Sequence, residues 1–147
     1  MRDIKSNMQQ VLLGTVTLSG TTPGASSWVD LRGFEGVVLS LITQTVTDAG
    51  TTDGFTFTAQ HSDLTTAASA ASIVAAEATD GVISISVTPD ADDDKLINGI
   101  CYRGSKRYLR LNGVGTTGTN AVVKILATLE VPAQAKTTFV GTAVAAT

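Results

Sequence analysis

Apolar and polar residues alternate along most of this chain, in short segments separated by turn-forming residues. The alternation is clearest at residues 55–60, where Phe55, Phe57 and Ala59 fall on one side and threonine and glutamine on the other. A period of two is typical of a β-strand with one buried face. Segments of this character predict strands at residues 11–18, 27–31, 37–43, 55–60, 81–87, 96–102, 106–111 and 121–131.

Residues 37–43 form the most hydrophobic run and are rich in β-branched side chains. A short hydrophobic run of this kind is typical of a central strand that is covered on both faces. A polar turn at residues 47–54 joins it to the strand at 55–60. We therefore expect these two strands to be antiparallel neighbours.

Residues 64–79 are rich in alanine and serine and allow two interpretations. Alanine favours a helix over residues 67–78. Serine, threonine and the lack of an apolar stripe favour a loop with a brief strand around Ile73 and Val74. We prefer the loop with a brief strand.

The pattern as a whole predicts an all-β protein, an antiparallel β-sandwich or jelly roll with extended terminal arms. Its body is expected at residues 11–131. Residues 1–10 are polar and have no clear period, so they are expected to form an N-terminal arm. Residues 132–147 are expected to form a C-terminal arm or a strand added to another subunit. Ile4, Met8 and Phe139 are the candidate interface residues of these arms.

The composition makes a nucleic-acid binder or a membrane protein an unfavourable interpretation. Charged residues make up 16% of the chain, against about 25% in typical soluble domains. The net charge is −3, whereas neutralising phosphates needs a surplus of lysine and arginine. The first residues lack the apolar segment of a signal peptide, and no run of 18 apolar residues occurs. We expect no nucleic-acid partner, no membrane association and synthesis in a cytoplasm.

The sequence offers no convincing catalytic arrangement. One cysteine, Cys101, and one histidine, His61, make a Cys–His pair formally possible, but no protease signature surrounds them. A bystander histidine and a buried cysteine are the better interpretation. Phosphate-binding loops and nucleophile-elbow motifs are missing from the sequence as well. We expect no enzyme activity and no cofactor.

The acidic turn at residues 90–94 has part of the spacing of a calcium loop. Asp90, Asp92 and Asp94 match the first, third and fifth ligand positions. Lys95 stands where such a loop has glycine, and Cys101 where it has the bidentate glutamate. A solvated turn, or a salt bridge to a neighbouring subunit, is the better interpretation, and we expect no metal site.

The segment from residue 95 to 110 holds five of the ten lysines and arginines and both tyrosines. Alternation would bury Arg107 together with Leu109 and Leu111, and would place Lys106, Tyr108 and Arg110 on the other face. A solvated strand face is one interpretation. An interface is the other, since arginine and tyrosine are enriched in buried protein contacts. The candidate interface residues of this segment are Arg103, Lys106, Arg107, Tyr108 and Arg110.

Three stretches, in their order and spacing, resemble a group of small tailed-bacteriophage virion proteins that are encoded near the major capsid protein. They are Val29–Val38 (VDLRGFEGVV), Ala59–Asp63 (AQHSD) and Tyr102–Leu111 (YRGSKRYLRL), and the resemblance covers about residues 28–130. The most specific part is the Gly-x-Lys-Arg-Tyr-x-Arg element at Gly104–Arg110.

The resemblance implies a capsid decoration, or cement, protein with a β-sandwich body. Such a protein would bind the major capsid protein on the outer surface of the phage head and stabilise the contacts between capsid subunits. It would be assembled in the host cytoplasm, and a homo-oligomer, with a trimer favoured, is expected.

Two other classes of function remain open from the sequence. A tail-tube or head-tail connector protein would share the β fold and the lack of catalysis. A carbohydrate-binding module would need Trp28 or Tyr108 exposed on a flat face. For Trp28 we prefer a role in capping the core to one in stacking on a ligand.

Overall fold

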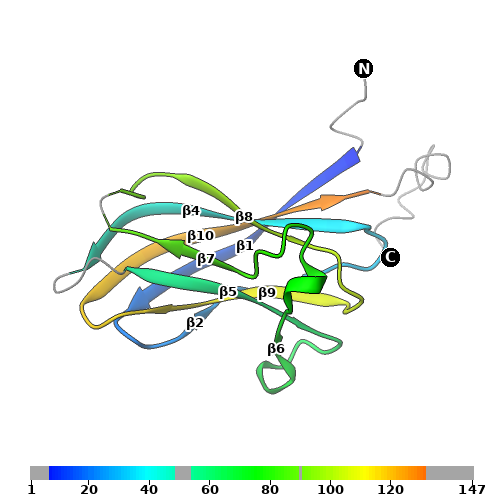
Figure 1. Ribbon diagram of the computed structural model, residues 1–147, viewed down its shortest axis with the longest axis horizontal. Coiled ribbons are helices and arrows are strands. Elements are labelled where there is room, and N and C mark those ends of the chain that lie inside the picture. The colour runs from blue at the N-terminus through cyan, green and yellow to red at the C-terminus, as the bar shows by residue number, and fades with distance from the viewer. Residues whose placement is uncertain (1–6, 49–53, 90, 132–147) are drawn as a thin grey trace.

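Two antiparallel β-sheets stacked face to face form the body of the protein (Figure 1). The computed structural model describes residues 7–48, 54–89 and 91–131. The prediction of an all-β sandwich is confirmed. The first sheet has four strands in the spatial order β1 (Met8–Ser19), β10 (Thr119–Glu130), β4 (Gly36–Asp48) and β8 (Leu96–Tyr102). All of these pairings are antiparallel.

The second sheet is built on two central strands, β5 (Phe55–Ser62) and β9 (Tyr108–Gly115), which pair along their whole length. Each central strand carries two short strands on its outer side instead of one long strand. These short strands are β2 (Gly24–Ala25) and β3 (Val29–Asp30) on β9, and β6 (Ala71–Ser72) and β7 (Ser84–Val87) on β5. Loops therefore interrupt both edges of this sheet.

The core lies between the sheets and follows the alternation in the sequence. In β10, every second residue from Thr119 to Leu129 is buried. From the other sheet, β5 contributes Phe55 and Phe57, whose rings meet edge to face with 5.5 Å between their centroids. Full burial of an aromatic or branched aliphatic side chain stabilises a fold by about 1.5–3 kcal/mol relative to exposure. These inward-facing residues hold the two sheets together.

β4 is a central strand, as its hydrophobic sequence predicts, but two details of the prediction are wrong. β4 lies between β10 and β8 instead of beside β5, because the chain crosses from the first sheet to the second between Asp48 and Phe55. Alternation specifies a buried face but not the sheet that a strand joins. In addition, Val38 and Ile42 on the outward face are only half-buried, so the coverage is complete on one face alone.

Residues 64–79 form a loop with a short strand, as we preferred, and not a long helix. Two single-turn 3-10 helices, η1 (Ala67–Ser69) and η2 (Ala75–Glu77), flank β6. The strand lies at Ala71–Ser72, just before its expected position. The segment is attached to the body through Ile73, whose side chain is buried and whose amide donates to the Ala59 carbonyl at 3.1 Å. The buried apolar residues of this segment, Ile73 and Ala78, do not form the continuous stripe along one face that an amphipathic helix needs.

The N-terminal strand begins earlier than the sequence pattern indicates. β1 starts at Met8, which pairs with Glu130, so that residues 8–10 belong to the first sheet. These three residues are exposed on both faces, and polar exposed positions carry no visible period. Residues 1–6 and 132–147, which hold most of the two expected arms, lie outside the described residues.

Candidate protein-binding end of the sandwich

Three stretches that are far apart in the sequence meet at one end of the sandwich. They are the stretches of the phage-protein resemblance, Val29–Val38, Ala59–Asp63 and Tyr102–Leu111. β9 pairs with β3 on one side, where the Leu31 amide donates to the Arg107 carbonyl at 2.8 Å. β9 pairs with β5 on its other side. The most specific stretch of the resemblance is therefore the central piece to which the other two are attached.

Arg107 lies in the loop before β9 and is held by Asp30. Its Nη2 donates to Asp30 Oδ2 at 2.7 Å, and its Nε donates to Asp30 Oδ1 at 3.1 Å. The hydrogen bond from Arg107 holds the pKa of the Asp30 carboxyl below its ordinary value, and the same pair raises the pKa of Arg107. The expected burial of Arg107 on a strand face is wrong, because β9 begins at Tyr108.

Lys106 makes a second link between distant stretches. Its Nζ donates to Asp63 Oδ2 at 2.6 Å, just after the end of β5. This hydrogen bond lowers the pKa of the Asp63 carboxyl. Both side chains are exposed, so water screens the attraction between them. Lys106 and Arg107 thus tie the loop before β9 to two different neighbours.

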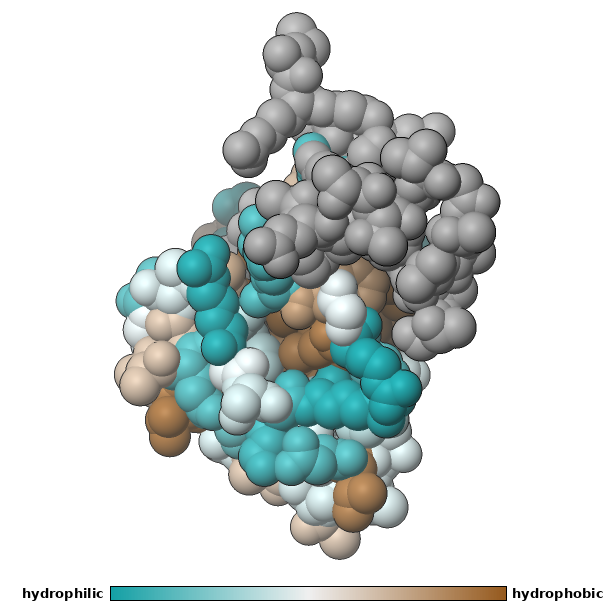
Figure 2. All heavy atoms as spheres, turned by 90° about the vertical axis from the view of Figure 1, so that its right-hand side faces the viewer, coloured by the Kyte–Doolittle hydropathy of each residue, from teal (hydrophilic) through white to brown (hydrophobic). Residues whose placement is uncertain are grey.

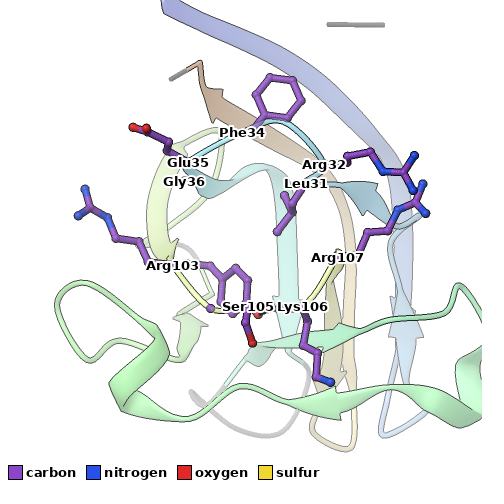
Figure 3. A pocket seen from close by; sticks show the side chains of 11 residues that line it. Leu31, Arg32, Phe34, Glu35, Gly36, Arg103, Ser105, Lys106 and Arg107 are labelled. Carbon is purple, nitrogen blue, oxygen red and sulfur yellow. Dashed lines mark hydrogen bonds between the residues drawn. The ribbon is translucent and has the colours of Figure 1, made fainter. Parts of the chain in front are cut away.

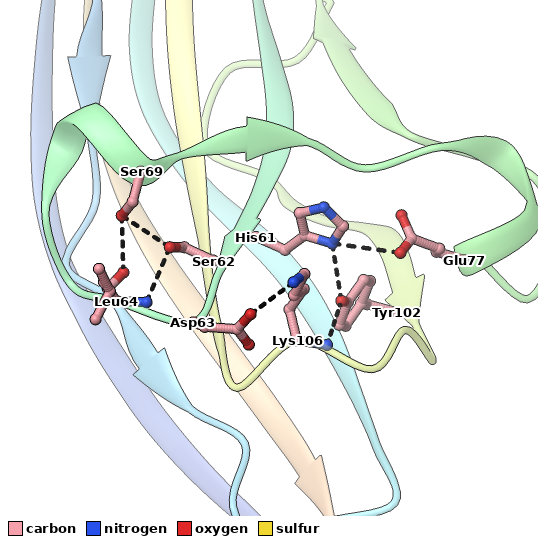
Figure 4. A network of polar contacts seen from close by, with 8 residues as sticks. All are labelled: His61, Ser62, Asp63, Leu64, Ser69, Glu77, Tyr102 and Lys106. Atoms are coloured by element: carbon pink, nitrogen blue, oxygen red, sulfur yellow. Dashed lines mark hydrogen bonds and ion pairs between the residues drawn. The ribbon is translucent and has the colours of Figure 1, made fainter.

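Tyr102 is the buried centre of a polar network beneath this loop (Figure 4). Its hydroxyl oxygen accepts from the Lys106 amide at 3.3 Å and lies 2.9 Å from His61 Nδ1. His61 Nδ1 in turn lies 3.4 Å from Glu77 Oε1. Burial raises the pKa of Tyr102. The histidine expected to be a bystander therefore connects β5 to the end of β8 and to η2.

Cys101 is separated from this network by the geometry of its strand. Neighbouring side chains point to opposite faces of a strand, so Cys101 faces away from Tyr102 and its partner His61. The thiol is half-buried and not fully buried as expected. Cys101 Sγ lies 3.2 Å from the hydroxyl of Thr79, which donates to it. In this arrangement the cysteine and the histidine do not form a catalytic pair.

A cavity of about 310 Å³ opens between the loop of residues 31–36 and the loop of residues 103–107. Figure 3 shows Leu31 pointing into the cavity, and Arg32 and Arg103 on opposite sides of it. In the space-filling view of this end, hydrophobic atoms in a hollow are edged by hydrophilic residues (Figure 2). The cavity is lined by Leu31, Arg32, Phe34, Glu35, Gly36, Tyr102, Arg103, Gly104, Ser105, Lys106 and Arg107.

Both loops that border the cavity are held by backbone hydrogen bonds. The Glu35 amide donates to the Glu130 carbonyl at 3.1 Å, and the Arg103 amide donates to the Glu77 carbonyl at 2.8 Å. The Arg32 amide donates to Asp30 Oδ1 at 3.0 Å. The shape of the cavity is therefore determined by the strands that the loops connect.

Tyr108 and Arg110 lie on the outward face of β9, outside the cavity. The Arg110 guanidinium is 4.5 Å from the centre of the Trp28 ring, and its Nε donates to Gln60 Oε1 at 3.0 Å. Burial lowers the pKa of Arg110. The Arg107 guanidinium is 4.8 Å from the centre of the Tyr108 ring. Both aromatic rings on this face thus have an arginine guanidinium over them, at the place where a sugar would stack.

Of the candidate interface residues of the arms, Met8 lies at the same end as the cavity, because its partner Glu130 also pairs with Gly36 of the cavity lining. Met8 is exposed at the start of β1. Ile4 and Phe139 lie outside the described residues. Arg103, Lys106 and Arg107 are therefore the predicted interface residues that the structure brings together at the cavity.

The acidic turn uses its carboxylates to accept hydrogen bonds from backbone amides, one of them in β4. Asp93 Oδ1 accepts from the Val46 amide at 2.7 Å, and Asp92 Oδ2 accepts from the Thr88 amide at 2.9 Å. Within residues 7–48, 54–89 and 91–131, no group of three or more histidines, cysteines or acids could hold a metal ion. The same residues include no helix long and apolar enough to cross a membrane.

The sequence patterns did not single out Arg32, Asp30 or Asp63 as parts of the site. All three fall within stretches of the resemblance, but the side-chain partners of Asp30 and Asp63 are more than forty positions away in the chain. A charged residue beside a turn is usually a solvated one, so no local pattern distinguishes these residues. The sequence offered one signal for these pairs. Two of the resembling stretches contain the acidic residues Asp30 and Asp63, and the third is basic.

No family model matches the sequence, and no curated protein matches it. Among solved structures, the PBSX exported protein XepA is similar to this chain with a TM-score of 0.55 and 13% identity. The likeness covers 84% of this chain and 37% of XepA, so this chain spans little more than a third of that protein's length. At this identity the likeness shows a shared fold alone.

Two other solved structures are less similar, with TM-scores below 0.5. A chain of the cyanophage Pam1 capsid has a TM-score of 0.42 and 15% identity, with 86% of each chain covered. The Clostridium thermocellum xylanase 10B CBM22-1–GH10 modules have a TM-score of 0.43 and 9% identity. That likeness covers 86% of this chain and 26% of the xylanase chain.

Proposed function

We propose that this chain is a virion structural protein of the decoration, or cement, class. It binds the outer surface of a phage head and stabilises the contacts between major capsid subunits. The observation that carries the proposal is the convergence of the three resembling stretches at one end of the sandwich. Val29–Val38 and Tyr102–Leu111 border one cavity. The third stretch, Ala59–Asp63, is joined to this lining through the ion pair of Asp63 with Lys106.

The construction of this end supports a binding role. The ion pairs Arg107–Asp30 and Lys106–Asp63 tie the loop before β9 to β3 and to the end of β5. Backbone hydrogen bonds hold both loops that border the cavity. A surface that is already ordered loses little conformational entropy when it binds a partner. Such a role requires no catalytic group.

We further propose that the protein acts as a homo-oligomer, with a trimer favoured, and that its arms add to the contact. Each site on a shell then contributes modestly, and the contributions multiply when several are engaged together. Met8, exposed at the start of β1, is the described residue nearest to this expected contact. Ile4 and Phe139 are its expected counterparts in the arms.

The test is the location of the protein in the particle. Heads and tails of the phage that carries the protein are separated, and each fraction is probed with an antibody; heads stripped of it are then mixed with purified protein and sedimented. We expect the protein in the head fraction, and saturable co-sedimentation with stripped heads. Its presence in tails alone, or assembly of the purified protein into tubes or rings without heads, would instead support the tail-tube or connector alternative.

A further inference from the structure

We infer that the cavity between residues 31–36 and 103–107 binds an extended acidic segment in which an apolar side chain lies between two carboxylates. The identification of the partner as the shell protein rests on the proposed function. The acidic and apolar character of the segment is inferred from the lining of the cavity alone.

The interior of the cavity is suited to an apolar side chain. Leu31 points into it, and Tyr102 and Phe34 are among its lining residues (Figure 3). Tyr102 itself is buried, and its hydroxyl is engaged with the Lys106 amide and with His61, so its polar group is not available to a ligand. A volume of about 310 Å³ is at the lower end of the range for ligand sites and has room for one large side chain with its backbone.

The rim of the cavity is basic. Its lining residues include four cations and one acid, Glu35, on a chain whose net charge is −3. Two of the cations, Lys106 and Arg107, already have acidic partners at 2.6 and 2.7 Å. Within the described part of the chain, the side chains of Arg32 and Arg103 have neither an ion pair nor a hydrogen bond.

The two unpaired guanidinium groups determine the pattern that the cavity selects. Arg32 and Arg103 lie on opposite sides of it, with Leu31 pointing inward between them (Figure 3). A guanidinium group binds a carboxylate through two parallel hydrogen bonds. A segment with one carboxylate on each side of an apolar residue satisfies both arginines and fills the interior. A ligand with a single anionic group would reach only one of the two arginines.

The basic rim is a small cluster of four cations on a chain whose net charge is −3, which favours a peptide over a nucleic acid. A nucleic acid needs a continuous basic surface along its phosphates. Next to the rim of the cavity, Asp30, Asp63 and Glu77 provide negative charge, and each is committed to a residue of this end. The positive charges of Arg32 and Arg103 are therefore complementary to a short acidic segment.

The direct test uses a synthetic probe and the full-length protein. The probe is a fluorescein-labelled peptide, Gly-Glu-Ser-Leu-Ser-Glu-Gly, measured by fluorescence anisotropy at low salt. Two matched peptides serve as controls, one with both Glu replaced by Gln and one with Leu replaced by Ser. We expect each control peptide to bind at least tenfold more weakly than the probe. Equal binding of either control peptide would overturn the inference.

The double variant Arg32→Gln/Arg103→Gln tests the assigned residues, and Lys124→Gln is its matched control. Lys124 is an exposed cation in the middle of β10, away from the cavity. We expect the double variant to weaken probe binding at least tenfold and Lys124→Gln to leave it unchanged. Since neither arginine side chain has a partner in the described residues, the thermal midpoint of the double variant should stay within about 2 °C of the wild type. Unchanged probe binding by a folded double variant contradicts the assignment.

Two further measurements separate this inference from the proposed function. If the double variant loses the probe but still co-sediments with heads, the partner segment is not in the shell protein, while the decoration role stands. If the wild type binds the probe but not heads, the decoration role fails and the chemistry of the cavity stands. Displacement of the probe by a short single-stranded oligonucleotide at a lower concentration than by unlabelled peptide would overturn the choice of an acidic peptide.

Discussion

The ring of Tyr102 fills the space that a side chain at position 104 would need. A Cβ atom on Gly104 would overlap the hydroxyl and ring atoms of Tyr102, which is itself buried. The buried ring cannot move away without breaking its contacts with His61 and the Lys106 amide. This close approach is the physical reason for glycine in the Gly-x-Lys-Arg-Tyr-x-Arg element.

Replacing Gly104 by alanine should therefore destabilise the protein. Overpacking of a well-filled site typically costs about 1–3 kcal/mol, and we expect a loss in this range for Gly104→Ala in urea unfolding. Gly36→Ala is the matched control in the same cavity. There the nearest atom to the added Cβ, Glu130 Oε2, is 3.4 Å away, an ordinary contact. An equal loss for both variants would contradict this account.

The Asp30–Arg107 pair should make stability depend on pH in a defined direction. The pKa of Asp30 in the folded protein is lower than its ordinary value of 3.8, so the carboxylate stabilises the fold fully above that pH. The contribution is lost as the pH falls below 3.8 through the lowered pKa. Because the pair is exposed, we expect Asp30→Asn to cost about 0.5–1 kcal/mol at pH 7.

This prediction is checked by urea unfolding of the wild type and Asp30→Asn at pH 7 and at pH 2. The difference between the two proteins should shrink towards zero in acid. Asp80→Asn controls for the loss of a carboxylate that makes no ion pair in the described residues. A difference that persists unchanged at pH 2 would show that Asp30 acts through something other than its charge.

Among the elements, β8 shows what could be predicted from the sequence, and β4 with β5 shows what could not. β8 lies at Leu96–Tyr102, where alternation predicts it. Alternation reports which face of a strand is buried, and that is a local property. Whether β4 pairs with β5 or with β10 depends on long-range packing, so the predicted neighbours were wrong. The start of β9 was missed because Lys106 and Arg107 continue the alternating pattern although they lie in a loop.

The candidate site was predictable in part for the same reason. The basic residues Arg103, Lys106 and Arg107 are dense in one segment, so they stand out locally. Their partners Asp30 and Asp63 are isolated charges, whose role appears only when β3, β5 and β9 come together. The cluster of basic residues can be recognised in the sequence. Its acidic partners can be identified only from the fold.

The packing of β7 against β8 should depend on Gly99 in β8, which faces Ile85 in β7. A Cβ atom on Gly99 would overlap the side chain of Ile85, which is buried against it. We expect Gly99→Ala to cost about 1–3 kcal/mol through overpacking, and Ile85→Ala to cost about 2–5 kcal/mol through loss of burial. Measured by urea unfolding, the double variant should be less destabilised than the sum of the two, because the overlap is removed. Strict additivity would rule out this contact.

At the scale of the whole molecule, the described strands form one core shared by two sheets, so we expect a single unfolding transition. Trp28 is the only tryptophan, and it reports on the end of the molecule that carries β3 and β9 through its contact with Arg110. Far-ultraviolet circular dichroism reports on both sheets. The midpoints of the two signals in urea should coincide. An earlier midpoint for the fluorescence would mean that the binding end opens before the rest of the body.

The pairing of β1 with β10 also gives the molecule a direction of mechanical weakness. Asn7 and Val131 lie side by side at one end of this ladder, joined by a 2.9 Å hydrogen bond, and Met8 pairs with Glu130 next to them. A tensile force between Asn7 and Val131 acts across the strands and opens the ladder one pair at a time, since antiparallel hydrogen bonds run perpendicular to the strands. A force between Asn7 and Asn120 acts along the strands and must shear many bonds together. A neighbour that pulls along the length of the sandwich therefore meets far more resistance than one that pulls at this corner (Figure 1).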